Sequence, residues 1–254
     1  MRRDLVRLLR DCADRYETAA FLDGDPSRFM HCVEGSRNKE ATAFVASCLS
    51  FGARSQFLPR IQWIVDSAKG DVDKWIRTGA FECDVPPDAS RCFYRFFTFR
   101  AMNAFLREYR SLMADSGTLG EFVRTRCGGD AVGAVRAICG RFGGDSCGSV
   151  VPKDASSACK RVCMFLRWMV RGSSPVDIGL WADIIDKRTL VVPLDTHVLQ
   201  EACRLGLLKS RVASMSAARR LTAALAEAFP DDPCRGDFAL FGVGVDGSAE
   251  TLTL

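Results

Sequence analysis

Apolar residues recur every three or four positions along almost the whole chain, and this spacing constrains the fold more than any other feature. Leu5, Leu8, Leu9 and Cys12, for example, form one apolar face of a first helix. No alternating pattern persists long enough to build a β-sheet. The sequence therefore predicts an all-α fold, a globule of many helices rather than a bundle of long ones. The helices expected after the first span 41–49, 55–65, 72–77, 97–113, 119–126, 131–142, 156–171, 195–203 and 214–229.

The composition is that of an ordinary soluble globular protein. Of 254 residues, 48% are hydrophobic and 26% are charged, which suffices for a sizeable core. No apolar run approaches the roughly 20 residues that span a bilayer, and the N-terminus lacks the apolar core of a signal peptide. We therefore expect a cytoplasmic protein with no membrane partner. A net charge of +4 is mildly basic and by itself does not establish nucleic-acid binding.

The 12 cysteines are scattered and none forms a Cys-x-x-Cys pair. Without an export signal, reduced thiols are expected. Cys159 and Cys163 lie one helical turn apart and could share a metal, but the chain has only two histidines, His31 and His197, to complete a zinc site. We expect the cysteines to be small core residues and predict no metal site.

The helix that begins near Lys160 combines an apolar body with a single charged stripe. Lys160, Met164, Arg167 and Arg171 share one face, whereas the other faces are almost wholly apolar. The stripe is expected to face water, a groove or a partner. Lys160 lies in the first turn, where the helix dipole and burial both disfavour an ammonium ion. Both effects would lower the pKa of the lysine and increase the fraction of nucleophilic amine.

A second helix is expected to begin at Asp195-Thr196-His197. Pro193 prevents a preceding helix from continuing into this segment. Asp195 is well placed either as a helix N-cap, with His197 packing locally, or as a carboxylate for chemistry with Lys160. The spacing alone leaves both interpretations open.

Residues 193–198, Pro-Leu-Asp-Thr-His-Val, resemble the Val-Asp-Thr-His-Val segment of the helix-hairpin-helix DNA glycosylases, the endonuclease III superfamily. The resemblance implies a two-lobed all-α fold with Asp195 as the catalytic aspartate. It also implies that Lys160 is the lysine that forms a Schiff base in the bifunctional members. The closest similarity is to a bacterial family of conserved hypothetical proteins within that superfamily. The interval from Lys160 to Asp195 resembles that of the archaeal 8-oxoguanine glycosylases.

Two further segments carry the resemblance. Residues 40–54 are similar to the early helix and turn that supply a wedge for the gap left by a flipped base, so Arg54 and Ser55 are expected to contact DNA. Residues 237–242 are similar to the closing helix. The whole chain, 1–254, is then one glycosylase-like unit with two lobes. The wedge-bearing lobe covers about 30–130, and the lobe with the hairpin and catalytic aspartate covers 1–29 plus 131–254.

The chain departs from the family pattern at the hairpin and at the cluster motif. Residues 151–157 contain no glycine where the usual hairpin has Leu-Pro-Gly-Val-Gly, which weakens the expected phosphate nest. Ser156 and Ser157, together with Arg161 and Arg167, are expected to contact DNA instead. The four-cysteine motif after the aspartate is absent, so no iron–sulfur cluster and no other cofactor is expected. An inserted turn or short helix is expected at 176–187.

The resemblance implies an enzyme of base excision repair, a DNA glycosylase with an associated AP-lyase activity. Its partner would be double-stranded DNA with a damaged base, such as an oxidised purine, at the nucleoid, with no obligatory protein partner. Phe165, Trp168 and Trp181 are candidates for a base pocket, although core packing is the better explanation for each. His197 is expected to orient the catalytic groups.

Three alternatives stay open. The chain could be a non-catalytic DNA-binding relative in which Lys160 only contacts phosphate. It could be a monofunctional glycosylase that uses Asp195 and water. It could also be an all-α protein-interaction module with an accidental motif match.

Overall fold

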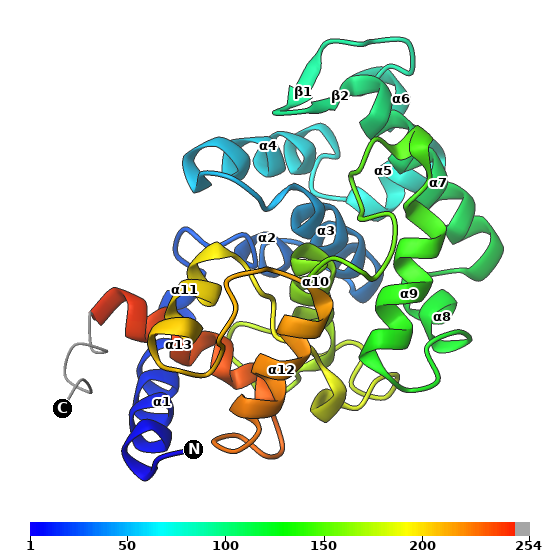
Figure 1. The fold of residues 1–254 in the computed structure, drawn as a ribbon. Helices are drawn as coiled ribbons and strands as arrows, with labels where there is room; N and C mark the ends of the chain where they lie inside the picture. Colours follow the sequence, from blue (N-terminus) through cyan, green and yellow to red (C-terminus); the bar gives the residue numbers. More distant parts are fainter. Residues whose placement is uncertain (247–254) are drawn as a thin grey trace. The chain divides into compact units, whose positions relative to one another are not determined.

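The structure, a computed structural model, describes residues 1–246 and is all-α, as predicted (Figure 1). Most of the helices are short, and a single β-hairpin accompanies them. The α-helices are α1 (Arg3–Tyr16), α2 (Arg28–His31), α3 (Ser36–Leu49), α4 (Arg54–Ser67), α5 (Val72–Thr78), α6 (Phe81–Asp84), α7 (Phe99–Ser116), α8 (Leu119–Arg124), α9 (Ala131–Phe142), α10 (Lys160–Val170), α11 (Thr196–Arg204), α12 (Met215–Leu225) and α13 (Gly236–Asp246). The strands are β1 (Cys92–Tyr94) and β2 (Phe97–Thr98).

The chain divides into two compact units, each assembled from segments that are not continuous in sequence. Unit 1 comprises Met1–Phe21, Asp130–Val132 and Ala155–Leu254. Unit 2 comprises Leu22–Gly129 and Gly133–Asp154. The candidate catalytic residues therefore all belong to unit 1, and the predicted wedge residues belong to unit 2.

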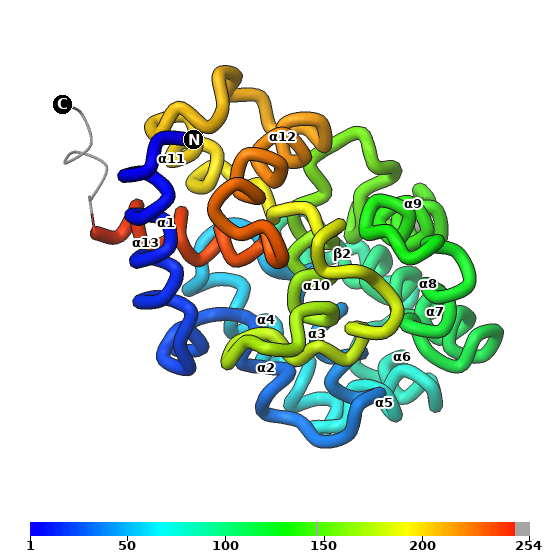
Figure 2. The backbone as a smooth tube through the Cα atoms, turned by 90° about the horizontal axis from the view of Figure 1, so that it is seen from below, coloured from blue at the N-terminus to red at the C-terminus, as the bar shows by residue number. Residues whose placement is uncertain are grey.

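Unit 1 brings the first and last described helices together. Helices α1 and α13 lie side by side in both views (Figures 1 and 2). Leu5 and Leu9 on α1 are buried, as are Phe238 and Leu240 on α13. Burial of large apolar side chains of this kind contributes about 1.5–3 kcal/mol each, so this contact is a substantial part of the core of unit 1.

Unit 2 is built around α3, whose residues are buried on nearly all sides. Phe44 of α3 contacts the rings of Phe105, Tyr109 and Phe142, which come from α7 and α9. Glu40, on the same helix, accepts hydrogen bonds from the backbone N–H groups of Leu119 and Gly120. Glu40 therefore satisfies two backbone N–H groups at the N-terminus of α8. It lies within α3, and not before it, because α3 begins at Ser36 rather than at the predicted residue 41.

The hairpin of unit 2 was not predicted. Strands β1 and β2 pair antiparallel and are joined by the two-residue turn Arg95-Phe96, with Arg95 at φ 52°. Strands of three and two residues are too short to produce an alternating pattern. The hairpin also displaces the start of the helix predicted at 97–113, because residues 97–98 are strand and α7 begins at Phe99 and ends at Ser116.

Helix α10 is shorter than its predicted span of 156–171, and both of its ends have an identifiable cause. Cys159 lies in the left-handed region at φ 45°, so the helix begins at Lys160. After Val170 the chain turns back, and the N–H groups of Ile178 and Gly179 both donate to the carbonyl of Trp168. The segment after the helix thereby caps its carbonyl end.

The return of the chain onto α10 depends on Gly179. This residue has φ +65°, and a Cβ built on it would lie 2.3 Å from the Cα of Gly172. No side chain fits in that space, so the two backbone segments can approach this closely only with glycine at position 179. This contact holds the loop that carries Asp177 against the end of α10.

The helix expected at 55–65 begins one residue earlier, at Arg54, with Ala53 rather than Ser55 at the N-cap. The segment 176–187, where a turn or a short helix was expected, forms turns and ends at the start of the 3-10 helix Lys187–Thr189. Because its N–H groups bond back to α10 and to turns, the segment needs no helical hydrogen bonds of its own.

Candidate functional site

Unit 1 brings Lys160 and Asp195 together at the N-termini of two helices. Lys160 is the first residue of α10, and its Nζ lies 3.9 Å from Oδ2 of Asp195. Asp195 is the N-cap of α11, where Oδ1 accepts a hydrogen bond of 2.9 Å from the Val198 N–H. Capping and pairing with the lysine therefore use different oxygens of one carboxylate. Both side chains are partly exposed, 29% for Lys160 and 41% for Asp195, so a ligand can reach them.

A second carboxylate, Asp237, belongs to the same group of charges. It lies in the first turn of α13, accepts a hydrogen bond from Arg167, and is within electrostatic range of Lys160 and Asp195. Burial raises the pKa of Asp237. Arg167 and Lys160 oppose this rise, whereas Asp195 adds to it. Sequence reasoning placed Asp237 only in a closing helix and did not connect it with the lysine.

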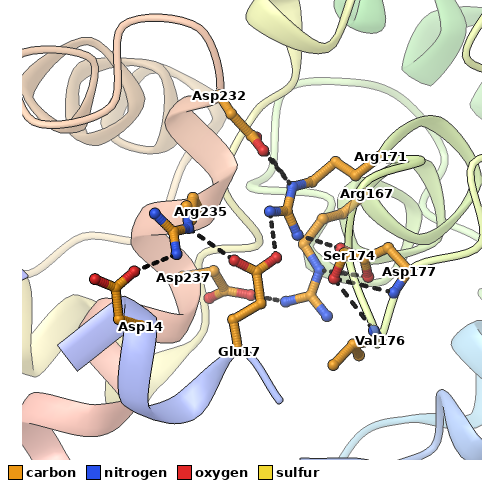
Figure 3. A network of polar contacts seen from close by, with 10 residues as sticks. All are labelled: Asp14, Glu17, Arg167, Arg171, Ser174, Val176, Asp177, Asp232, Arg235 and Asp237. Atoms are coloured by element: carbon orange, nitrogen blue, oxygen red, sulfur yellow. Dashed lines mark hydrogen bonds and ion pairs between the residues drawn. The ribbon is translucent and has the colours of Figure 1, made fainter. Parts of the chain in front are cut away.

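The arginines of the predicted charged stripe point into the core of unit 1, not toward water or DNA. The side chains of Arg167 and Arg171 are 4% and 3% exposed, and both bind Asp177, whose side chain is fully buried (Figure 3). The Nε of Arg167 lies 3.3 Å from Asp177. A buried guanidinium held by carboxylates is not available to a phosphate. The prediction that Arg167 contacts DNA is therefore corrected to a structural role.

The ion-pair network continues from Arg171 to the N-terminal segment. Arg171 donates to Glu17 at 2.6 Å and to Asp232 at 2.9 Å, and Arg235 donates to Glu17 and Asp14 (Figure 3). Residues far apart in sequence thus converge on α10. The only sequence signal for this network is the presence of two arginines on a helix that is otherwise apolar.

Glu17 makes the network sensitive to acid. Burial acts to raise the pKa of Glu17, but Arg171 and Arg235 outweigh it, and the pKa lies below its usual value of 4.5. A carboxylate with a depressed pKa stabilises the fold fully above its unfolded pKa, and this contribution is lost as pH falls through the folded value. We expect Glu17→Gln to lower the free energy of unfolding by about 3 kcal/mol at pH 7, with the deficit shrinking below about pH 4.5.

Urea unfolding followed by circular dichroism at pH 7, 5 and 3.5 checks this expectation. Glu34→Gln, at an exposed position, is the matched control and should change little at any pH. A deficit for Glu17→Gln that stays constant down to pH 3.5 would contradict it.

The predicted base-pocket residues form core. Phe165, Trp168 and Trp181 are at most 1% exposed, and Phe165 packs edge-on against Trp181 with ring centroids 5.0 Å apart. No base can stack on rings that are already enclosed. The burial of these three residues fits the core interpretation and not the base pocket.

The other predicted residues of unit 1 lie near the start of α10 and α11. Ser156 and Ser157 are exposed in the turn before α10, and Arg161 is half-buried in its first turn. His197 is exposed on α11 and packs beside Gly244 of α13, where a Cβ would lie 2.4 Å from its Nε2. The roles predicted for these residues, DNA contact and orientation, stay predictions.

Unit 2 presents a second candidate surface at the hairpin tip, which we define as Phe51, Arg54, Ser55, Arg95 and Phe96. Phe96 is 62% exposed, and its ring contacts Phe51 at 5.1 Å between centroids. The guanidinium of Arg95 lies over the Phe51 ring. Arg54 and Ser55 are exposed, and Arg54 pairs loosely with Asp25 at 3.8 Å. Residues 50–65 contain two arginines and no acidic residue. Sequence reasoning found Arg54 and Ser55 but missed Phe96.

Residues 1–246 contain no group of three or more histidine, cysteine, aspartate or glutamate side chains arranged to hold a metal ion. No helix in the same range is long and apolar enough to cross a membrane. All 12 cysteines lie in this range, none of them forms a disulfide, and most are buried.

Comparison with known protein families places most of the chain in a described family. A family model described as "Protein of unknown function (DUF2400)" matches residues 25–246, which cover most of unit 1 and nearly all of unit 2. The chain belongs to this family. Neither curated proteins nor solved structures give a match to this DUF2400 chain. Because the family's function is unknown, the site geometry has to carry the functional argument.

Proposed function

We propose that this DUF2400 protein is a DNA base-excision glycosylase with an associated AP-lyase activity. The observation that carries the proposal is the pairing of Lys160 with Asp195, an amine and a carboxylate 3.9 Å apart, both accessible and both at helix N-termini. The resemblance of residues 193–198 to the helix-hairpin-helix glycosylases supports the same assignment. The substrate is duplex DNA with a damaged base, such as an oxidised purine, so the protein acts at the nucleoid.

The chemistry requires one nucleophile and one stabilising charge. The neutral Lys160 amine attacks the sugar C1′, a C–N bond forms, and the bond from C1′ to the base breaks. The base leaves with that electron pair and takes up a proton, and the amine loses one of its own. Ring opening then gives an imine between Lys160 and C1′, from which elimination can cleave the strand. The Asp195 carboxylate stabilises positive charge on the sugar as the base departs.

The N-terminal position of both residues suits these roles. A helix N-terminus disfavours an ammonium ion, which helps Lys160 to act as an amine. The capping hydrogen bond from Val198 fixes the carboxylate of Asp195 while its second oxygen faces the lysine. A positioned charge of this kind needs no reorganisation during reaction.

The hairpin tip of unit 2 supports DNA as the partner. It combines an exposed phenylalanine with arginines, which pair with phosphates while an aromatic ring stacks on bases. Extrusion of a damaged base costs a few kcal/mol, which contacts of this kind can offset.

Borohydride trapping tests the proposal directly. The wild-type protein is incubated with duplexes that carry an oxidised purine or an abasic site, and with undamaged duplex as control. A covalent adduct on damaged DNA only, together with release of the base, is expected. Base release without an adduct would indicate a monofunctional glycosylase. Binding without either reaction would indicate a non-catalytic DNA-binding protein, and no binding at all would indicate an interaction module.

Phe96→Ala is expected to weaken binding to duplex DNA roughly tenfold, because stacking of one base on an aromatic ring contributes about 1–3 kcal/mol. Val245→Ala, which trims an exposed apolar side chain of unit 1, is the control and should leave affinity unchanged. Fluorescence anisotropy at fixed salt measures both. Equal affinities for the two variants would remove Phe96 from the DNA-binding surface.

A further inference from the structure

The Lys160 site contains a carboxylate that the chemistry above does not use. Asp195, from the N-cap of α11, lies 3.9 Å from the amine of Lys160 on α10, and Asp237, from the first turn of α13, lies within electrostatic range of both residues. Arg167, two turns along α10 from the lysine, holds Asp237 by a hydrogen bond. The fold therefore fixes Asp237 in place independently of Lys160.

The two carboxylates differ in their surroundings. Asp195 is 41% exposed and accepts a backbone N–H, whereas the side chain of Asp237 is 15% exposed and packed among charged groups. Two acids placed in such different environments commonly divide their tasks, with one kept ionised and the other exchanging a proton.

The charged groups around Asp237 come from four elements. Helix α10 supplies Lys160 and Arg167, the N-cap of α11 supplies Asp195, and the 3-10 helix Pro233–Arg235 supplies the buried Cys234. Helix α1 and the residue after it face the far side of the network, where Asp14 and Glu17 bind Arg235. Along the whole network the carboxylates outnumber the cations.

We propose that Asp237 is a positioning residue that controls the charge of the Lys160 amine, while Asp195 serves the reacting sugar. An anionic Asp237 adds a second negative charge near the amine and holds it as ammonium. Protonation of Asp237 removes that charge and favours the amine. This inference rests on the proposed function, because Lys160 is the nucleophile of the proposed reaction and can attack only as the neutral amine.

The test measures Lys160 itself, without DNA. Lysines of the full-length protein are reductively methylated with 13C-formaldehyde, and NMR follows each dimethylamine signal with pH. The Lys160→Arg variant identifies the Lys160 signal among the seven lysines of the chain. In Asp237→Asn the midpoint of the Lys160 titration is expected to fall by roughly 0.5–1 pH unit, because loss of a nearby anion disfavours the ammonium.

Asp232→Asn is the matched control, since Asp232 belongs to the same network but binds Arg171, at the opposite end of α10 from Lys160. Its Lys160 midpoint should equal that of the wild type. An unchanged midpoint in Asp237→Asn, or an equal shift in both variants, would overturn the inference. Circular dichroism confirms that each variant is folded, and Asp237→Glu should restore the midpoint.

The outcome is separable from that of the proposed function. A shifted midpoint with no trapped DNA adduct would leave the Asp237 coupling intact and remove the glycosylase assignment. Where adducts do form, the pH at which trapping reaches half its maximum should move down in Asp237→Asn with the Lys160 midpoint.

Discussion

Lys160→Met is expected to abolish borohydride-trapped adducts and to reduce base release by roughly 10³-fold or more, because it removes the nucleophile while keeping an unbranched side chain. The side chain of Lys160 is partly exposed, so the loss of one amine should leave stability nearly unchanged. Gel analysis of adducts and single-turnover base release measure the two effects.

Two further variants separate catalysis from phosphate contact. Lys160→Arg keeps a positive charge but not a nucleophile, so it should bind DNA like the wild type and form no adduct. Full activity of this variant would mean that Lys160 only contacts phosphate. Asp195→Asn keeps a good helix N-cap, since asparagine and aspartate cap equally well, and should lose base release without loss of stability. An undiminished adduct in Lys160→Met would remove the lysine from the reaction.

Asp177→Asn is expected to lower the free energy of unfolding by about 3–5 kcal/mol, the largest stability effect that we predict. Asp177 is fully buried and binds both Arg167 and Arg171, which are themselves at most 4% exposed. Asparagine has the same shape but no charge, so the buried guanidinium groups of Arg167 and Arg171 lose one of their counter-ions. The free-energy cost of burying positive charge without a negative partner then lowers the stability. Urea denaturation at pH 7 measures the change.

The matched control is Asp186→Asn, which breaks an ion pair with Arg188 on the surface of unit 1. Exposed pairs contribute little because water and salt screen them, so unfolding of this variant should be indistinguishable from that of the wild type. Similar losses in the two variants would mean that burial does not determine the strength of the Asp177 contacts.

The helical framework was predictable because periodicity reports local burial. Helix α9 begins and ends where the spacing placed it, at Ala131 and Phe142, and α12 begins directly after Ser214, the first residue of its predicted span. The hairpin was missed because its strands are too short for a pattern. The start of α10 was misplaced because Cys159 adopts a left-handed conformation that a cysteine does not signal.

The candidate site was predictable only in part. The pairing of Lys160 with Asp195 was expected from the resemblance of residues 193–198 to the glycosylases, because the spacing alone left it open, and the structure places the two 3.9 Å apart. The orientation of Arg167 did not follow, because a charged stripe on an apolar helix predicts exposure unless its partners are known. Those partners, Asp177 and Asp237, lie on a loop and on another helix, and sequence spacing carries no information about contacts of this range.

The packing of α1 against α13 has a consequence for how this protein folds during its synthesis on the ribosome. Translation runs from the N-terminus to the C-terminus, so α1 is synthesised well before α13, the helix that packs against it. Glu17 is likewise synthesised well before its partner Arg235. The residues of unit 2 are complete well before that, so unit 2 is expected to fold on the nascent chain while α1 still exposes an apolar face. During synthesis this face is the segment most in need of a chaperone.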